Sequence, residues 1–554
     1  MYTSNGDRVY YGLESSLNYR LERTLAKIDK LKQHGYNVET MWECKFRKML
    51  KEDPNLDNRL NNNPNLIFND GINPRDAIYG GRTEVFKLYH KVKKNEKIRY
   101  LDFCSLYPTV NLYGKYPIGH PIQRLSGKNC DQINNLQSTD GFIKCVILPP
   151  QDLLIPVLPV RIHGKLYFCL CRTCVETENI NKCTHNEQQR ALFGTWVICE
   201  VNLAITYGYK ILHKIEIWTY ETCSYDKNTR IGGIFTDYMK TFLKLKQEAS
   251  GWPTDEHHTN VEKQNEYIKM YKEKEGIDLE RENIKVNPSY RNLAKLCANS
   301  LWGKLSQRPV HSETTCVDSP IDLHLMAESP AIVINDIQIV GKKLWVNWKY
   351  SNDDEFRSQQ KNISITTGAF TTTHARIMLF NELIQLGHTV LYCDTDSIIY
   401  VENPDITSKY KPDLGFCIGQ LTDEVAGYGD GAYIESFVSI GPKSYAFRVK
   451  VPGKKGFTEV AKCKGFIASG KNKQKLNFKN FKKMVCGNNN DSTDDDDDDD
   501  DDNCDNISTV TTRKIKRIKG FQVVSEPERK KFGFTFTKRV CINDHNTIPY
   551  GYIF

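Results

Sequence analysis

The chain has 554 residues, of which 39% are hydrophobic and 26% are charged, with a formal net charge of +8 at pH 7. This hydrophobic content is enough for several packed domains, and no apolar run approaches the roughly 20 residues that span a bilayer. Residues 1–7 lack the apolar core of a secretory signal, so we expect an intracellular protein and not a secreted or membrane one. Eighteen scattered cysteines then indicate free thiols and metal sites in a reducing compartment.

The charge balance favours a polyanionic partner. Nine consecutive aspartates occupy residues 494–502, and setting these nine aside from the net +8 leaves +17 on the rest of the chain. A basic surplus of this size is typical of proteins that bind nucleic acids, although a basic protein without such a partner would show the same charge.

Hydrophobic periodicity predicts helical and strand-rich segments in alternation. Residues 8–50 have a helical pattern, residues 51–70 are rich in Asn, Asp and Pro and predict a loop, and strands are expected at 83–90 and 98–103. A mixed region is expected at 110–225, and helices are expected from 235, at 291–303 and at 366–387. The stretch at 251–288 is polar, the stretch at 305–360 is strand-rich, and the region from 441 is basic and β-rich.

Residues 100–108, Tyr-Leu-Asp-Phe-Cys-Ser-Leu-Tyr-Pro, predict a strand that ends in a carboxylate. After Asp102 the chain turns through small and polar residues to Tyr107 and Pro108. Asp102 is therefore a candidate metal ligand, whereas Tyr107 is either a functional ring or a core tyrosine packed against Pro108.

A cysteine-rich island follows at residues 169–185. Its potential tetrahedral zinc ligands are a C-x2-C knuckle and a C-x-H pair, Cys171, Cys174, Cys183 and His185. The short spacing differs from common zinc modules, so loosely packed buried cysteines are the alternative, with Cys169 as a substitute ligand.

Residues 291–303 have helical spacing with two different faces. One stripe combines two cations, an amide and a ring, namely Arg291, Lys295, Asn299 and Trp302. The opposite face carries mainly apolar residues, namely Leu293, Leu296, Cys297, Ser300 and Leu301. A cationic stripe with a ring suits a bound polyphosphate with a base beside it, and an ordinary solvated face is the alternative.

Residues 391–400, Leu-Tyr-Cys-Asp-Thr-Asp-Ser-Ile-Ile-Tyr, predict a strand, an acidic turn and a returning strand. Residues at i and i+2 of an extended chain point the same way, so Asp394 and Asp396 are expected side by side. Two such carboxylates repel each other unless a cation lies between them, and hard oxygen ligands suit Mg²⁺. The alternative is an Asp-rich turn without a metal.

Together and in this order, the three segments resemble motifs A, B and C of family B DNA polymerases, D-x-x-S-L-Y-P, K-x-x-x-N-S-x-Y-G and D-T-D-S, with Trp302 at the tyrosine position. Residues 441–445, Gly-Pro-Lys-Ser-Tyr, resemble the K-x-Y element, and residues 79–82, Tyr-Gly-Gly-Arg, resemble the Y-x-G-G element with one residue fewer. The chain is most similar to the protein-primed branch, and within it to polymerases of Polinton (Maverick) type mobile elements and related viruses, through residues 73–83, 192–196 and 547–552.

The resemblance implies an α+β right-hand fold with an antiparallel palm sheet, helical fingers and a thumb. It divides the chain into an amino-terminal remnant (1–95), a first palm segment with motif A and a cysteine-rich insertion (96–230), and fingers with motif B (231–303). A second palm segment with an insertion and motif C (304–440) and a thumb with a disordered acidic loop at 487–507 (441–554) follow.

The same resemblance assigns the chemistry. Asp102 and Asp394 would bridge two Mg²⁺ ions that clamp attacking and leaving oxygens, Asp396 would support them near the primer end, and the carbonyl of Phe103 would complete one metal's shell. The amides of Ser105 and Leu106 would cradle the triphosphate.

The cationic stripe would complete the nucleotide site. Arg291 and Lys295 would neutralise the triphosphate, Asn299 would lie against the nucleotide, and Trp302 would stack near the templating base. One of the lysines at 244 and 246 would also reach the triphosphate. The ring of Tyr107 would block a 2′ hydroxyl, which disfavours an enzyme that builds RNA.

The expected partners are template–primer DNA, deoxynucleoside triphosphates and a terminal priming protein, bound by a monomer. DNA contacts are expected at the Y-x-G-G and K-x-Y elements, at Tyr79, Gly80, Gly81, Lys443 and Tyr445. The basic cluster at 513–519 predicts a thumb strand that grips the duplex, with a nuclear localisation signal as the alternative; nuclear location rests on the mobile-element resemblance.

Residues 1–150 contain no D-x-E motif, so we expect no proofreading exonuclease in this chain. The aspartate run is interpreted as a tolerated loop expansion, with DNA mimicry as the alternative. Two functions remain from the sequence, an active DNA polymerase and a catalytically silent DNA-binding protein derived from one.

Overall fold

The structure, a computed structural model, describes residues 17–35, 37–53, 71–133, 135–308, 312–340, 343–351, 363–403, 410–466, 470–487, 507–517 and 523–553. The chain forms a larger unit of residues 70–306, 364–512 and 528–554, and a smaller unit of residues 1–69, 307–363 and 513–527. The aspartate run at 494–502 and most of the loop expected at 51–70 lie outside the described residues. None of the described helices is both long enough and apolar enough to cross a membrane.

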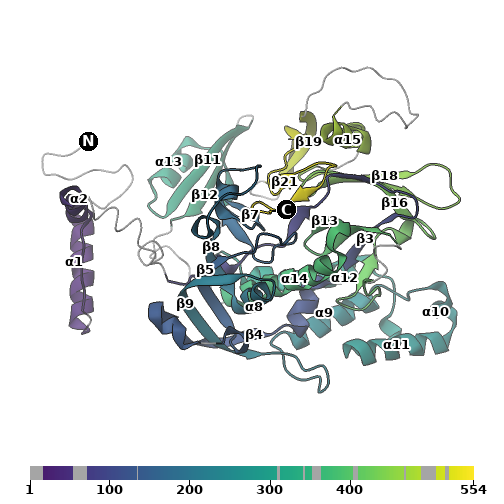
Figure 1. Ribbon diagram of the computed structural model, residues 1–554, viewed down its shortest axis with the longest axis horizontal. Coiled ribbons are helices and arrows are strands. Elements are labelled where there is room, and N and C mark those ends of the chain that lie inside the picture. Colours follow the sequence, from purple (N-terminus) through teal and green to yellow (C-terminus); the bar gives the residue numbers. More distant parts are fainter. Residues whose placement is uncertain are drawn as a thin grey trace. The chain divides into compact units, whose positions relative to one another are not determined.

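The larger unit is built around an antiparallel sheet (Figure 1). Its strands follow the spatial order β1 (Thr83–Val85), β13 (Val390–Asp394), β14 (Ser397–Glu402), β3 (Lys97–Phe103), β16 (Tyr433–Gly441), β17 (Ser444–Lys450) and β18 (Thr458–Lys462), with β15 (Leu421–Asp423) on β3 and β2 (Tyr89–Lys91) on β16. The predicted palm sheet is confirmed. The single strand expected at 83–90 is wrong, because its two halves pair with β13 and β16 respectively.

Alternation along the central strands supplies two cores, one on each face of the sheet. Cys393 and Ile398 pack in one cluster together with α14 residues such as Leu379, whereas Tyr392 and Ile399 pack in the other. The helix expected at 366–387 is confirmed as α14 (Ile365–Leu386), and α5 (Leu106–Tyr113) packs against it.

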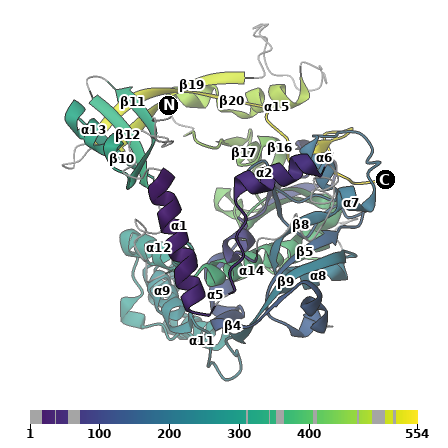
Figure 2. The ribbon, with the colours of Figure 1, turned by 90° about the vertical axis from the view of Figure 1, so that its left-hand side faces the viewer.

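The segment between motif A and the fingers forms a second antiparallel sheet, whose strands β9, β5 and β8 lie side by side in Figure 2. Its order is β4 (Tyr116–Ser126), β9 (Lys210–Cys223), β5 (Gly141–Leu148) and β8 (Leu192–Val197), followed in sequence after β8 by α8 (Ile198–Thr206). The cysteine-rich island lies in the connection from β5 to β8, with β6 (Val160–Ile162), β7 (Lys165–Tyr167), α6 (Arg172–Glu176) and α7 (Glu187–Arg190).

The fingers segment is helical, and its first and last helices pack against each other. It comprises α9 (Thr236–Glu248), α10 (Asp255–Thr259), α11 (Val261–Glu275) and α12 (Pro288–Leu305). The stretch expected to be merely polar at 251–288 therefore contains two helices, and Tyr267 and Tyr271 of α11 are buried in a core with α9. Leu293 and Leu296 lie opposite the cationic stripe, as expected, yet both are exposed.

The described part of the carboxy-terminal region combines strands with α15 and a short 3-10 helix at Gly470–Gln474. Its elements after β18 are α15 (Phe478–Cys486), a two-stranded sheet of β19 (Ile507–Arg517) and β20 (Val523–Gly533), and a two-stranded sheet of β21 (Val540–Cys541) and β22 (Thr547–Ile548). The expected strand at the basic cluster is confirmed for residues 513–517, whereas its DNA contact stays a prediction.

The described helices and strands of the smaller unit include α1 (Leu17–Gln33), α2 (Glu43–Glu52) and a sheet in the order β10 (Glu313–Val317), β12 (Lys343–Tyr350), β11 (Ile332–Val340), with α13 (Pro320–Glu328). The helical pattern at 8–50 is confirmed within the described residues. Within the described residues of 305–360, the expected strands are confirmed as β10, β11 and β12, whereas α13, which Ser319 caps and Pro320 begins, was not expected.

Candidate active site

Three neighbouring palm strands bring the two predicted metal ligands together. In the register of β13, β14 and β3, Asp394 lies opposite Ser397, and Ser397 lies opposite Asp102. Directly opposed residues project from the same face, and two strand spacings separate the Cα atoms of the aspartates by about 10 Å. The small Ser397 between them leaves space on that face for both carboxylates to approach a common ligand.

Asp396 occupies the turn between the two strands of motif C. Thr395 has a left-handed backbone (φ 61°), and the Phe103 amide donates to the Asp396 carbonyl (2.7 Å). The expectation that Asp394 and Asp396 share an extended chain is therefore wrong, because the chain reverses between them. The turn instead ties motif C to the end of β3, where Asp102 lies.

The electrostatics of these carboxylates suit a divalent cation. Burial, and secondly the charge of Asp396, raise the pKa of Asp102 to about 7. Burial also raises the pKa of Asp396. Asp394 accepts from Lys443 Nζ (2.8 Å) and from Thr83 Oγ1 (2.8 Å). Crowded, half-buried carboxylates are hard oxygen ligands whose repulsion a bound Mg²⁺ would relieve, so this donor set fits the predicted metal.

A group of cations from the fingers faces motif A. Lys246 Nζ donates to Ser105 Oγ (2.7 Å), and Arg291 Nε donates to Ser250 Oγ (3.0 Å). Burial lowers the pKa of Lys246, and the charges of Arg291 and Lys295 lower it further. Closely spaced cations of this kind are stabilised by an anionic ligand.

Of the two lysines expected to reach the triphosphate, the structure favours one. Lys246 lies at the motif A turn, where Ser105 has a left-handed backbone (φ 58°). Lys244 instead pairs with Glu280 and Glu248 within the fingers. Leu106 is buried, which suits a role for its backbone amide only.

The rings of Tyr107 and Trp302 stack on each other, with centroids 4.9 Å apart and planes 25° apart. The contact joins α5 to α12, and Asn299 lies half-buried one turn earlier on α12. Burial raises the pKa of Tyr107 to about 12, so its hydroxyl stays neutral. Motifs A and B therefore meet at an aromatic pair.

The Y-x-G-G element lies against motif C. A Cβ atom at Gly81 would lie 2.6 Å from Thr395 Oγ1, whereas one at Gly80 would have open space. Arg376 donates to the carbonyl of Tyr79 (2.9 Å) and forms a buried ion pair with Glu200 (2.7 Å). The Tyr79 ring is buried and packs within the protein in this structure, and its contact with DNA stays a prediction.

The K-x-Y element forms the turn between β16 and β17. Lys443 has a left-handed backbone (φ 61°), and its amide donates to the Tyr392 hydroxyl (3.0 Å). Tyr445 is buried, and its hydroxyl lies 3.0 Å from that of Tyr100. Neighbouring aromatic rings cover the Tyr445 side chain in this structure, and its DNA contact stays a prediction.

Sequence reasoning missed three residues that hold the site together, namely Thr83, Glu200 and Arg376. Thr83 directly follows the Y-x-G-G element, and its place opposite Asp394 is a matter of strand register. Arg376 lies in a largely apolar helix, where a lone arginine is the signal of a buried partner.

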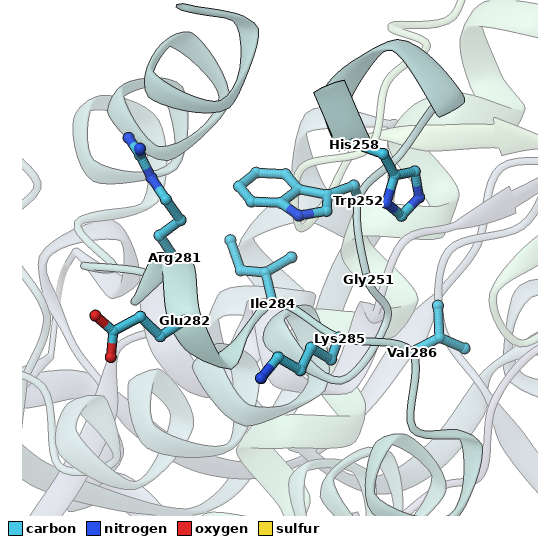
Figure 3. Close-up of a pocket in the computed structure, with 8 residues that line it drawn as sticks. All are labelled: Gly251, Trp252, His258, Arg281, Glu282, Ile284, Lys285 and Val286. Carbon is cyan, nitrogen blue, oxygen red and sulfur yellow. The ribbon is translucent and has the colours of Figure 1, made fainter. Parts of the chain in front are cut away.

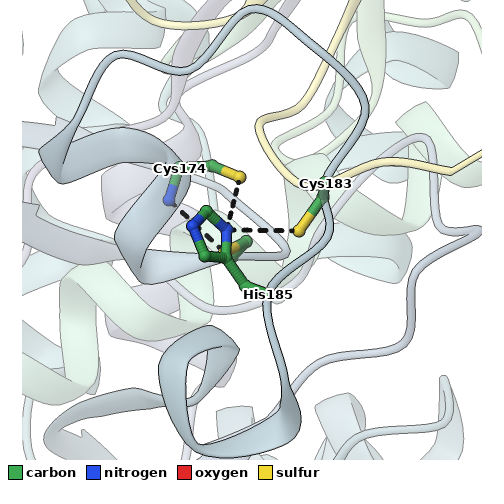
Figure 4. A group of neighbouring side chains, drawn as sticks. Cys174, Cys183 and His185 are labelled. Atoms are coloured by element: carbon green, nitrogen blue, oxygen red, sulfur yellow. Dashed lines mark hydrogen bonds between the residues drawn. The ribbon is translucent and has the colours of Figure 1, made fainter.

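The predicted zinc ligands converge (Figure 4). The ligand atoms of the four residues all lie within 4.8 Å of one another, and His185 Nδ1 lies 3.4, 3.3 and 3.5 Å from the sulfurs of Cys171, Cys174 and Cys183. Tetrahedral ligation by zinc predicts sulfur–nitrogen distances of about 3.6 Å from its usual bond lengths. The donor set and spacing therefore fit zinc, and Cys169 is not needed as a substitute.

A separate hollow of about 480 Å³ opens on the fingers (Figure 3). Its lining combines an indole ring, basic groups and one carboxylate, from Gly251, Trp252, His258, Arg281, Glu282, Ile284, Lys285 and Val286. Two of the lining residues, Lys285 and Val286, lie just before α12. None of the predicted nucleotide-binding residues lines this hollow.

Comparison with known proteins agrees with this geometry. Residues 45–264, less than half of the chain, match the family described as DNA polymerase type B, organellar and viral. Phi29 DNA polymerase, in a complex with primer-template DNA and incoming nucleotides, superposes with a TM-score of 0.50 at 15% identity over 93% of this chain and 66% of that one. The structure of phi29 DNA polymerase with primer-template DNA alone superposes with a TM-score of 0.50 at 16% identity, over 83% of this chain and 62% of that one.

This chain has a DNA polymerase fold. A DNA polymerase of Kluyveromyces lactis is 24% identical over 364 residues, which are 64% of this chain and 29% of the yeast protein. The chain thus spans less than a third of this curated relative and about two thirds of phi29 DNA polymerase.

Proposed function

We propose that this chain is a DNA-directed DNA polymerase, which adds deoxynucleotides to a primer 3′ hydroxyl. The observation that carries the proposal is the approach of Asp102 and Asp394 across Ser397, beside the fingers cations, within a polymerase fold. A protein that only bound DNA would gain nothing from a half-buried carboxylate whose pKa is raised to about 7.

Each residue group would contribute a distinct part of the chemistry. Mg²⁺ held by Asp102 and Asp394 would supply positive charge for the attacking and leaving oxygens. Lys246, Arg291 and Lys295 would hold the triphosphate against the motif A turn. The Tyr107–Trp302 stack would close one side of the nucleotide site, and with the ring of Tyr107 under the sugar a 2′ hydroxyl would clash.

Lys443 would exchange partners during the reaction cycle. Its ammonium neutralises Asp394 in this structure, at 2.8 and 3.1 Å from the two carboxylate oxygens. When a metal supplies that charge, Lys443 would become free to hold a phosphate of the primer strand, as the K-x-Y resemblance implies.

The Cys/His group would bind a structural zinc. A hydrogen bond from Cys171 lowers the pKa of the Cys174 thiol, which favours the thiolate that zinc requires. All four positions would be filled by protein, as in structural rather than catalytic sites.

The wider biology belongs to the same proposal. Its support is the resemblance to protein-primed polymerases, which favours replication from a terminal protein hydroxyl, a mobile-element or viral origin, nuclear location and a monomeric enzyme. A priming assay with labelled deoxynucleotide and a candidate terminal protein tests this proposal: covalent labelling of that protein supports it, and labelling of DNA primers alone contradicts it.

The activity itself is tested by extension of a recessed primer with Mg²⁺ and four deoxynucleotides. The proposal predicts extension by the wild type and none by Asp102→Asn. Duplex binding without extension by either protein would favour the silent DNA-binding protein instead. Tyr107→Val should admit ribonucleotides, and unchanged rejection would contradict the sugar role.

A further inference from the structure

Asp394 lies on β13, the second strand of the palm sheet, and β1 forms the edge beside it. Thr83 lies opposite Asp394 in the β1–β13 register, and its Oγ1 donates to Asp394 Oδ1 at 2.8 Å. β1 has only three residues, so pairing with β13 alone would hold it weakly. The position of Thr83 therefore depends on what covers the outer edge of β1.

Carboxy-terminal residues cover that edge. Thr547 donates from Oγ1 to the Val85 carbonyl (2.6 Å) and from its amide to the Phe86 carbonyl (2.8 Å). The Leu88 amide donates to the His545 carbonyl (2.8 Å), which extends the contact beyond β1. A segment more than 450 positions downstream thus supplies the hydrogen bonds that this edge needs.

Buried ion pairs also hold the carboxy-terminal segment against β1. Glu84 pairs with Arg82, which precedes β1, and with Arg539 from the carboxy-terminal segment (3.5 Å), and all three side chains are about 1% exposed. Arg539 also donates to the Leu154 carbonyl (3.1 Å) and from Nε to Thr547 Oγ1 (3.0 Å). Buried charges are stable only with all partners in place, so this group allows one position of the segment against β1.

The far end of the segment is held by the cysteine-rich island. The Leu170 amide donates to the Tyr550 carbonyl (2.8 Å). Gly551 has a left-handed backbone (φ 87°), and a Cβ atom there would lie 2.4 Å from Cβ of Cys171. Only glycine fits this contact, so the segment is fixed at both ends.

We propose that the segment of residues 538–551 positions the Asp394 carboxylate, with Thr83 and Arg539 as positioning residues. Thr83 acts on the carboxylate directly, and Arg539 acts through Glu84 and the edge of β1. The inference rests on the proposed function, because it gives the contact a purpose in metal binding. Partners of this kind typically change metal affinity by about 10- to 100-fold.

The direct test compares Thr83→Val with Thr83→Ser. Mn²⁺ binding is titrated by electron paramagnetic resonance on the protein without DNA, and extension rates are measured separately. Thr83→Val should weaken Mn²⁺ binding about 10-fold or more and lower kcat with little change in the nucleotide KM. Thr83→Ser should restore both, because it keeps the hydroxyl. Wild-type Mn²⁺ affinity in Thr83→Val would overturn the proposal.

The second test reaches Asp394 from the segment itself. Arg539→Met should weaken Mn²⁺ binding, as Thr83→Val does. Asp544→Asn changes another residue of the segment, removes only its ion pair with Lys87, and should leave Mn²⁺ binding unchanged. If Arg539→Met does not fold, Thr547→Val is measured instead, since it removes one hydroxyl only. Equal Mn²⁺ affinity in the folded variant and in Asp544→Asn would refute the role of the segment.

Failure of the proposed function and failure of the positioning give different results. A wild type that binds Mn²⁺ through Asp394 but extends no primer would contradict the proposed function and leave the positioning intact. A wild type that extends primers while the Thr83 and Arg539 variants keep its Mn²⁺ affinity would contradict only the positioning.

Discussion

Gly81→Ala tests how the motif C turn is held. The new Cβ atom would lie 2.6 Å from Thr395 Oγ1 and 2.8 Å from Thr395 Cγ2. Ordinary contacts need at least about 3.4 Å, so something must move by roughly 0.8 Å. Thr395 cannot withdraw easily, because its amide donates to the Arg82 carbonyl at 2.7 Å. Overpacking of this kind costs about 1–3 kcal/mol of unfolding free energy.

The same movement should reach the chemistry. Thr395 Oγ1 lies 3.1 Å from Asp394 Oδ1, and a shift of its side chain would disturb that hydrogen bond. A misplacement near 1 Å in a catalytic group costs about 100-fold in rate, so we expect a loss of that order in primer extension. The assay pairs single-turnover extension with the midpoint of thermal unfolding.

Two further variants separate the clash from other effects. Gly80→Ala adds the same methyl group to open space and has no left-handed backbone, so its unfolding midpoint should equal or exceed that of the wild type. Gly81→Ala combined with Thr395→Gly should recover stability but not rate, because the clash and the hydrogen bond both disappear. A Gly81→Ala protein as stable and active as the wild type would refute the predicted contact.

Three more outcomes follow from the site. Lys246→Met should raise the nucleotide KM about 10-fold or more while Lys244→Met leaves it unchanged, and equal effects would contradict the assignment of Lys246. Cys174→Ser should lose its zinc and unfold at a lower temperature, whereas the exposed Cys541→Ser should keep its metal; zinc-free wild-type protein would contradict the centre. In the metal-free protein, the pKa of Asp102 is raised from 3.8 to about 7, so the folded state binds this proton more tightly than the unfolded state. The resulting contribution to the free energy of unfolding is complete below about pH 4 and is lost as pH rises through about 7. Asp102→Asn should therefore gain thermal stability relative to the wild type between pH 5 and pH 8, and parallel curves would contradict the raised pKa.

Contiguous chemistry could be predicted from the sequence. The strand before Asp102, the hairpin around Asp394, the helix with Arg291 and Lys295, and the Cys/His group each depend on short spacings, which fix local geometry. The palm sheet was predicted only through the resemblance of these segments to family B DNA polymerases.

The sequence could not predict which residues are buried by segments that are distant along the chain. Tyr445 carries the pattern of a DNA-contacting residue, but burial by Tyr100 and Phe447 depends on which strands pair across the sheet. Arg539 and Glu84 are 455 positions apart, and periodicity carries no information on such partners. The helices of the fingers tip were missed because charged residues dominate α11, although Tyr267 and Tyr271 at i and i+4 were a usable signal.

The central claim is that Asp102 and Asp394 serve metal-dependent DNA synthesis, and one measurement tests it most directly. Purified wild type, Asp394→Asn and the surface control Asp544→Asn are compared in extension of a recessed primer with Mg²⁺, alongside duplex binding. We expect extension by the wild type and the control, and none by Asp394→Asn despite retained binding. Extension by Asp394→Asn at the wild-type rate would contradict the account.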